Sequence, residues 1–256
     1  MIEVKDLCKT FELSKREMKE RNSSSRQSLA VDQVSFECKP GRVFSLLGPN
    51  GAGKTTTLRM IASILRPTSG SVTVAGYDVV KNSTEARRKM GFLTGSTGLY
   101  DRLSAEESVK YFADLFDVTP AQYKERRDRL FTLLGMNDFA KKRIGQLSTG
   151  MKQKVSIVRT MIHDPEVVVF DEPTSGLDVI TAENIIQLIN DCKSQGKTVI
   201  FSSHIMSEVD LLADDLAMIH QGKLVFNDTM DAFRAQMQSV SITKEFIRII
   251  RESEKA

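Results

Sequence analysis

The sequence predicts an α/β fold in which a parallel sheet is joined to an antiparallel β layer and to an inserted group of helices. Three observations predict it. The short, largely apolar runs 42–47, 167–170 and 198–201 are typical of strands that are covered on both faces, and such strands usually run parallel. Alternation of apolar and polar residues near the amino terminus indicates half-buried strands. Clear helix-start signals between residues 99 and 164 indicate helices.

Composition is ordinary for a globular protein and excludes several classes. The 256 residues are 41% hydrophobic and 27% charged, and 36 basic residues against 33 acidic ones give a formal charge of +3. Because this charge is small and evenly spread, no nucleic-acid partner is expected. The chain has neither the apolar core of a signal peptide nor an apolar run near the roughly 20 residues that span a bilayer. We therefore expect a cytoplasmic protein with unpaired cysteines, which reaches the membrane only through a partner.

The antiparallel layer is expected from the segments 2–11, 30–38 and 71–75, which place apolar residues at alternate positions. Residues 12–28, between the first two segments, are rich in Lys, Arg, Glu and Ser. This composition is too polar to pack and predicts a mobile, solvated excursion. A basic contact with lipid headgroups or with a partner is the alternative.

The stretch 48–56, Gly-Pro-Asn-Gly-Ala-Gly-Lys-Thr-Thr, matches the phosphate-binding pattern G-x-x-x-x-G-K-[ST] between a predicted strand and a predicted helix. Glycines let the backbone N–H groups point at phosphate oxygens, and the helix dipole adds positive potential. Lys54 is expected to reach the β- and γ-phosphates, and the hydroxyl of Thr55 is expected to bind Mg²⁺. The residues expected to contact nucleotide here are Gly48, Pro49, Asn50, Gly51, Ala52, Gly53, Lys54, Thr55 and Thr56.

Residues 99–164 predict three helices. Two of them begin with capping boxes, which pair Ser104 with Glu107 and Thr119 with Gln122. The third begins at Ser148, Thr149 and Gly150 and is stopped at Asp164, which a proline follows. A hydroxyl with free N–H groups at a helix start can form an anion site, and an ordinary helix cap is the alternative.

Polar residues end two of the predicted parallel strands, and the helical segment 180–194 connects them as a βαβ crossover. The first strand leads to Asp171 and Glu172, and the second leads to His204. In α/β proteins the carboxyl edge of the parallel strands, where these residues lie, binds ligands. We expect Asp171 to bind Mg²⁺, Glu172 to act as general base and His204 to contact the γ-phosphate and the attacking water. Taken singly, an acidic surface pair and a structural histidine are the alternatives.

The expected organisation is one domain that covers residues 1–256. Its parts are a catalytic core with the β layer (1–98 and 165–228), a helical subdomain (99–164) and a helical tail (229–256). Within the second part of the core, a hairpin is expected over 216–226.

Five motifs, in this order and spacing, resemble those of ABC transporter ATPase subunits. They are the Walker A loop (48–56), the signature (147–151), the Walker B strand (167–173), the D-loop (175–178) and the H-loop (His204). The match covers almost the whole chain, and the signature separates this family from kinases, GTPases and helicases.

The resemblance implies ATP and Mg²⁺ as ligands, with Glu172, His204 and Lys54 in catalysis. It also implies a nucleotide-dependent homodimer in which the signature of one subunit completes the ATP site of the other. Ser148, Thr149, Gly150 and the D-loop residue Asp178 are then further nucleotide-site residues. Phe11 falls where the family has an aromatic residue that stacks on adenine, and a core aromatic is the alternative.

Two departures from the family pattern stand out. Thr149 and Met151 replace the Gly and Gln of many members, a variant seen in exporter subunits that work with separate permease chains. Gly95 stands where the family has a Gln or Glu that contacts Mg²⁺ or water. A hydroxyl or backbone group nearby is expected to take over that contact, and the alternative is that the contact is dispensable. The candidates are Thr94, Ser96, Thr97, Gly95 and Gly98.

The function that this resemblance implies is that of an ATP-hydrolysing motor subunit of an exporter, peripheral on the inner face of the membrane and bound to an integral membrane permease. Segments 2–11 and 91–103 resemble the ATP-binding subunits of bacterial sodium-extruding exporters. The alternative is a soluble ABC ATPase that acts on translation or nucleic acid. A single set of motifs and the lack of an extended heptad run favour the exporter.

Overall fold

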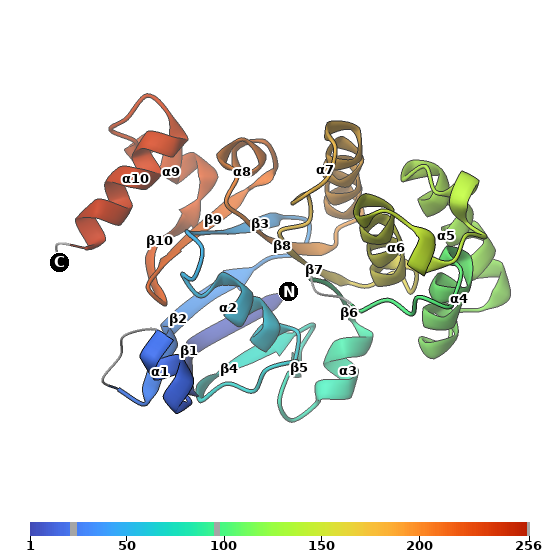
Figure 1. Ribbon diagram of the computed structural model, residues 1–256. Coiled ribbons are helices and arrows are strands. Elements are labelled where there is room, and N and C mark those ends of the chain that lie inside the picture. Colours follow the sequence, from blue (N-terminus) through green and yellow to red (C-terminus); the bar gives the residue numbers. More distant parts are fainter. Residues whose placement is uncertain (21–24, 95–97, 255–256) are drawn as a thin grey trace.

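The computed structural model describes residues 1–20, 25–94 and 98–254. Figure 1 shows strands at the centre, with one group of helices beside β6 and β7 and another group at the carboxyl-terminal end. Within the described residues no helix is both long enough and apolar enough to cross a membrane.

A six-stranded sheet forms the centre of the molecule, in the order β10-β9-β3-β8-β7-β6. Its strands are β3 (Val43–Leu47), β6 (Met90–Leu93), β7 (Val167–Asp171), β8 (Thr198–Ser203), β9 (Asp215–His220) and β10 (Lys223–Thr229). All neighbours pair in parallel except β9 and β10, which form an antiparallel hairpin. Every residue of β3, β7 and β8 is buried, as the apolar runs predict. The parallel core and the hairpin are therefore confirmed.

A second, antiparallel sheet has the order β2-β1-β4-β5. It consists of β1 (Ile2–Glu12), β2 (Gln27–Cys38), β4 (Ser69–Val74) and β5 (Tyr77–Asp78). The predicted antiparallel layer is confirmed. A buried apolar cluster that includes Ile2, Val34, Phe36, Phe44 and Ile200 fills the space between the two sheets.

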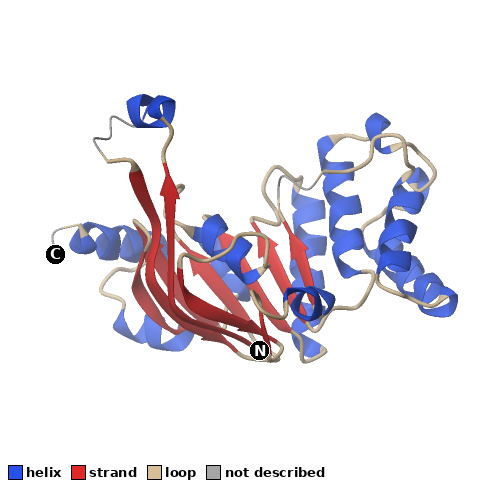
Figure 2. Cartoon of the chain, turned by 90° about the horizontal axis from the view of Figure 1, so that it is seen from below, coloured by secondary structure: helices blue, strands red, loops and turns tan. Residues whose placement is uncertain are grey.

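Most described residues of the segment 12–28 are exposed, as predicted, but the two ends of the segment belong to strands. The strands β1 and β2 stay paired as far as Glu12 and Gln27, and α1 (Lys15–Glu20) follows at the end of this long hairpin (Figure 2). The reason is that strand pairing uses backbone hydrogen bonds, which polar side chains do not prevent. The excursion is thus shorter than predicted and partly helical.

The remaining helices surround the central sheet. They are α2 (Lys54–Ile61), α3 (Ser83–Arg88), α4 (Ala105–Leu115), α5 (Pro120–Leu133), α6 (Thr149–Met161), α7 (Val179–Ser194), α8 (Met206–Leu212), α9 (Met230–Gln236) and α10 (Ile242–Ser253), with short 3-10 turns at Asn137–Phe139 and Ile144–Gln146. The helices α4, α5 and α6 lie together on one side of the molecule (Figure 1). Both predicted capping boxes are present, with reciprocal hydrogen bonds between cap and third residue. The helices predicted in 99–164 are confirmed.

His163 lies just after α6 in a mostly apolar setting. Its ring stacks on Phe116 with centroids 3.9 Å apart, and its Nε2 lies 3.3 Å from the carbonyl oxygen of Met90. Its Nδ1 is buried and has no hydrogen-bond partner within the described residues. Burial lowers the pKa of His163 to about 4, because a protonated ring would place an unpartnered N–H in this setting.

This arrangement predicts a loss of stability in mild acid. The unfolded chain takes up the proton near the ordinary pKa of 6.5, whereas the folded chain does so near 4, so stability is full above about pH 6.5 and falls toward pH 4. We expect His163→Phe, which keeps a ring beside Phe116, to remove about 2 kcal/mol of the stability loss between pH 7 and pH 5. Urea unfolding of both proteins at the two pH values measures this. An unchanged pH dependence in the variant would contradict the assignment.

Candidate functional site

The phosphate loop connects β3 to α2 and is held tightly by its neighbours. A Cβ atom on Gly48 would lie 2.3 Å from the carbonyl oxygen of Ile219, and one on Gly53 would lie 2.6 Å from that of Ala30. Gly53 also has φ 111°, a conformation that favours glycine. It begins α2 without a side-chain cap, so the first N–H groups of the helix are left for an anion. The loop therefore fits a phosphate chain.

Lys54 lies inside this loop. Its Nζ donates to the carbonyl oxygens of Gly48 at 2.7 Å and Pro49 at 3.2 Å, and it lies 3.8 Å from Oε1 of Glu172. Burial lowers the pKa of Lys54, while the charges of Glu172 and Asp171 act in the opposite direction. The ammonium group is thus placed between the loop and the acidic pair.

Asp171, at the end of β7, accepts hydrogen bonds from two hydroxyl groups. The hydroxyl of Thr55, on α2, donates to Oδ1 of Asp171 at 3.1 Å. The hydroxyl of Ser202, on β8, donates to the same oxygen at 2.7 Å. Asp171 is also buried. Oxygen ligands of this kind suit Mg²⁺, which binds through one or two carboxylates together with phosphate oxygens. Within the described residues no group of three acidic, histidine or cysteine side chains could hold a metal alone. Phosphate oxygens or water would complete the coordination of a metal ion here.

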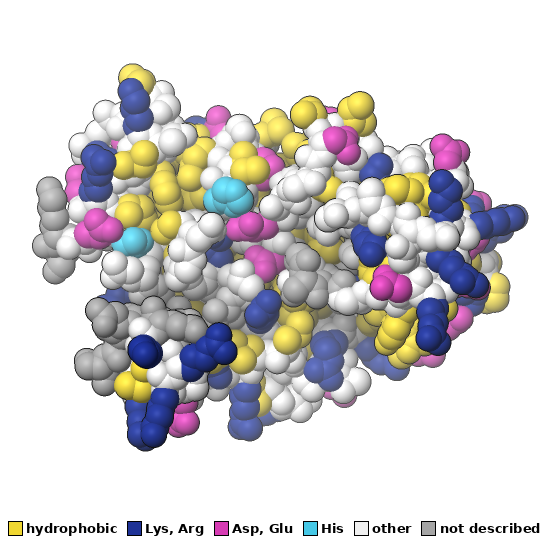
Figure 3. Space-filling model, in the orientation of Figure 1, with side chains coloured by type: hydrophobic (Ala, Val, Ile, Leu, Met, Phe, Trp, Pro, Cys, Tyr) yellow, Lys and Arg dark blue, Asp and Glu magenta, His cyan; other side chains and the backbone are white. Residues whose placement is uncertain are grey.

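Glu172 and His204 come together from β7 and from the end of β8. The Nδ1 atom of His204 lies 3.2 Å from Oε1 of Glu172. The backbone of Glu172 has φ 50° and is held by its N–H, which is 3.1 Å from Oγ and 3.2 Å from the carbonyl oxygen of Ser202. A non-glycine residue at positive φ persists only where its surroundings fix it. The side chain of His204 is 47% exposed. Figure 3 shows histidine and acidic side chains at the surface, near the centre of the face in view.

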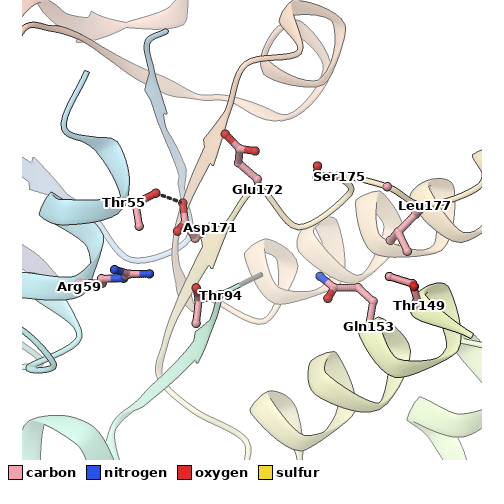
Figure 4. A pocket seen from close by; sticks show the side chains of 10 residues that line it. Thr55, Arg59, Thr94, Thr149, Gln153, Asp171, Glu172, Ser175 and Leu177 are labelled. Carbon is pink, nitrogen blue, oxygen red and sulfur yellow. Dashed lines mark hydrogen bonds between the residues drawn. The ribbon is translucent and has the colours of Figure 1, made fainter. Parts of the chain in front are cut away.

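A hollow of about 420 Å³ opens beside these residues. Figure 4 shows Thr55 and Asp171 on one side of it, and Thr149 of α6 on the other side. Its lining consists of Thr55, Arg59, Thr94, Thr149, Gln153, Asp171, Glu172, Ser175, Gly176 and Leu177. Thr94 lines the hollow, whereas Gly95, Ser96 and Thr97 lie outside the described residues.

Three residues expected at the site, Phe11, Ser148 and Asp178, do not line the hollow in the single chain. Phe11 on β1 is 37% exposed, carries the Lys9 ammonium 5.2 Å from its ring centre and does not line the hollow. Ser148 caps α6 by accepting a hydrogen bond from Met151. Asp178 caps α7 by accepting from the N–H of Thr181 at 2.9 Å and from its hydroxyl at 2.7 Å. These two hydrogen bonds lower the pKa of Asp178.

Two polar residues that line the hollow, Arg59 and Gln153, are not singled out by the sequence, and Ser202 is indicated there only as one member of a polar run. Ser202 is part of the polar run after the apolar strand, but the run itself does not say which hydroxyl faces Asp171. Its register opposite Asp171 in the β7–β8 pair is the signal that identifies it. Gln153 lies one turn after Thr149 on α6, which helical spacing could have indicated.

Residues 31–175, more than half of the chain, match the family model described as ABC transporter. The chain belongs to the ABC transporter family. It is similar to the ABC transporter ATP-binding protein NatA of Bacillus subtilis, with 40% identity over 248 residues that cover 96% of this chain and 97% of that one. It is also 36% identical to the linearmycin resistance ATP-binding protein LnrL of the same species over 195 residues, which cover 76% of this chain and 63% of the relative.

Solved structures of ABC ATP-binding subunits share the fold. One, an ATP-binding subunit of an ABC transporter, has a TM-score of 0.86 and 25% identity, covering 97% of this chain and 99% of that one. Another, a dimeric ATP-binding cassette in a post-hydrolysis state with bound ADP and phosphate, has a TM-score of 0.78 and 25% identity, covering 90% and 99%. The predicted α/β fold is therefore confirmed, and ATP is the family's nucleotide.

Proposed function

We propose that this ABC transporter ATP-binding subunit hydrolyses ATP and drives export through a separate integral membrane permease. The observation that carries the proposal is the convergence of Lys54, Thr55, Asp171, Glu172 and His204 at the carboxyl ends of three parallel strands. Nucleotide hydrolysis needs a phosphate cradle, a metal site and a base close together, and each has a residue here.

In this proposal the residues divide the work of hydrolysis. Lys54 and the N–H groups of the loop bind the β- and γ-phosphates. Thr55 and Asp171 hold Mg²⁺, which neutralises charge on the phosphates when it is bound. Glu172 takes a proton from the attacking water, and His204, 3.2 Å away, fixes the orientation of that carboxylate and contacts the γ-phosphate.

The second half of the site comes from a second copy in this proposal. Ser148, Thr149 and Gly150 begin α6 with a helix N-terminus, which attracts the γ-phosphate of a facing subunit. Asp178 of the D-loop then lies at the same boundary between the two subunits. Phe11 stacks on adenine. The dimeric state of a similar cassette with bound ADP and phosphate supports this arrangement.

The partner and the cargo are inferred from relatives and from the family resemblance. Similar proteins are described as linearmycin resistance, bacitracin transport and multidrug transporter ATP-binding proteins, which supports a role in export. The resemblance of segments 2–11 and 91–103 to subunits of sodium-extruding exporters points to Na⁺. The chain then binds its permease at the inner face of the membrane. Its parts are the core (1–98 and 165–228), the helical subdomain (99–164) and the tail (229–256).

Hydrolysis and binding should separate by mutation. Glu172→Gln keeps the shape of the side chain but removes the base, so we expect ATP binding to persist while hydrolysis falls by about 10²–10⁴. Lys54→Ala should instead weaken ATP binding itself. Nucleotide-binding titrations and phosphate-release assays of both variants measure this. Hydrolysis by Glu172→Gln at the parent rate would sink the assignment of the base.

The Glu172→Gln protein should also dimerise with Mg-ATP and stay monomeric without it, because the nucleotide supplies the charge that joins the two halves of each site. Sedimentation velocity with and without Mg-ATP, using Lys54→Ala as control, distinguishes this. A dimer that is equally stable without ATP would contradict the nucleotide-bridged arrangement.

Export is tested by co-expressing this chain with a membrane protein whose gene adjoins its own, where that neighbour has about six apolar segments of spanning length. Co-expression should give a complex that hydrolyses ATP faster than the chain alone and moves Na⁺ across vesicles, with Glu172→Gln as the inactive control. Failure of Na⁺ to move, while ATPase stimulation persists, would discard sodium and leave the motor role. Co-purification with ribosomes or DNA in place of a membrane protein would favour the soluble alternative.

A further inference from the structure

Three buried polar side chains, those of Thr174, Ser203 and Glu208, form a cluster close in the chain to Glu172 and His204. Each is at least nine-tenths buried. Thr174 donates to Oε1 of Glu208 at 2.5 Å, and Ser203 donates to Oε2 at 2.8 Å. The two oxygens of one carboxylate therefore accept hydrogen bonds from two segments, the loop after β7 and the last residue of β8.

These two segments carry the proposed catalytic side chains. Thr174 lies two residues after Glu172, and Ser203 directly precedes His204. The carboxylate of Glu208 thus joins the loop after β7 to the end of β8. His204 and Glu172, whose Nδ1 and Oε1 atoms lie 3.2 Å apart, belong to or directly follow these two segments.

The start of α8 shows that this connection replaces an ordinary helix cap. Glu208 occupies the third position of α8, from which a glutamate commonly accepts the N–H of the capping residue. Here the N–H of that residue, Ile205, donates to Oγ of Ser203 at 3.0 Å, and Ser203 donates in turn to Glu208. The glutamate is thereby free to reach Thr174.

Burying a carboxylate with neutral partners is costly, and a well-packed apolar trio could fill the same space. The hydrogen bonds add direction, because hydroxyl groups that donate to a carboxylate fix distance and angle more closely than apolar contacts do. On the other side, the backbone N–H of Glu172 is already held by Ser202. The general base is therefore fixed from β8 and, through Thr174, from α8.

We propose that Glu208 is a positioning residue, which sets the relation of His204 to Glu172 by hydrogen-bonding Ser203 and Thr174 at once. This inference rests on the proposed ATP hydrolysis. Loss of either hydroxyl lets one segment shift against the other, and a displacement of about 1 Å at a reacting group can lower a rate by about 10²-fold.

The test compares Thr174→Val, which keeps the shape and removes the hydroxyl, with Thr174→Ser, which keeps the hydroxyl. We expect Thr174→Val and Glu208→Gln to lower kcat for ATP by about 10- to 100-fold while KM changes by less than about twofold, because the phosphate loop is untouched. Thr174→Ser should retain a kcat near that of the parent. Thermal unfolding and ATP-binding titrations accompany each assay.

Glu245→Gln is the matched control. Glu245 is also a buried carboxylate, on α10, where it accepts hydrogen bonds from Arg248 and from the N–H groups of Gln238 and Ser239. Its substitution should lower thermal stability and leave kcat unchanged. Equal kcat for Thr174→Val and Thr174→Ser, or an equal loss of kcat in Glu245→Gln at the same loss of stability, would overturn the inference. A parent protein without ATPase activity would instead overturn the proposed function.

Discussion

The parallel pairing of β3, β7 and β8 is the constraint on which the site depends. Strands that run in one direction end at one edge, so the phosphate loop after β3, the acidic pair after β7 and His204 after β8 meet there. Each strand is buried along its whole length, and hydrophobic packing therefore fixes its register. The polar residues begin where the apolar runs stop. Segments more than 100 residues apart, such as those of Thr55 and Asp171, come within hydrogen-bond distance in this way.

The phosphate loop depends on packing from outside the loop. Its glycines leave room for the carbonyl groups of Ile219 in β9 and Ala30 in β2, so residues of both sheets pack closely against the loop. The N–H of Gly222 also donates to the carbonyl oxygen of Ala52 within the loop. A loop fixed on both sides presents its N–H groups in one arrangement, which lowers the entropy cost of binding phosphate. The antiparallel layer, which has no catalytic residue, thus contributes to the shape of the site.

Much of this structure could be predicted from the sequence because local rules decide it. The buried strands and the two capping boxes are each set by residues close together in the chain, and both are confirmed. The loop motif is also set locally, and its binding of phosphate stays a prediction. The segment 12–28 was predicted wrongly in part, since backbone pairing continues where side chains are polar. The roles of Ser202, Thr174 and Glu208 could not be predicted, because each depends on a partner about 30 or more residues away. Asp178 and Ser148 cap helices in the single chain, and their nucleotide contacts remain a prediction that needs the second subunit.

The most direct measurement is the structure of the Glu172→Gln protein determined with ATP and Mg²⁺. The account predicts the γ-phosphate beside Lys54, the metal ion bound by the Thr55 hydroxyl and Asp171, and His204 facing the γ-phosphate. The nucleotide should lie along the loop of residues 48–56 at the carboxyl edge of β3. A nucleotide bound away from this edge, or a metal ion held by neither Thr55 nor Asp171, would contradict the account.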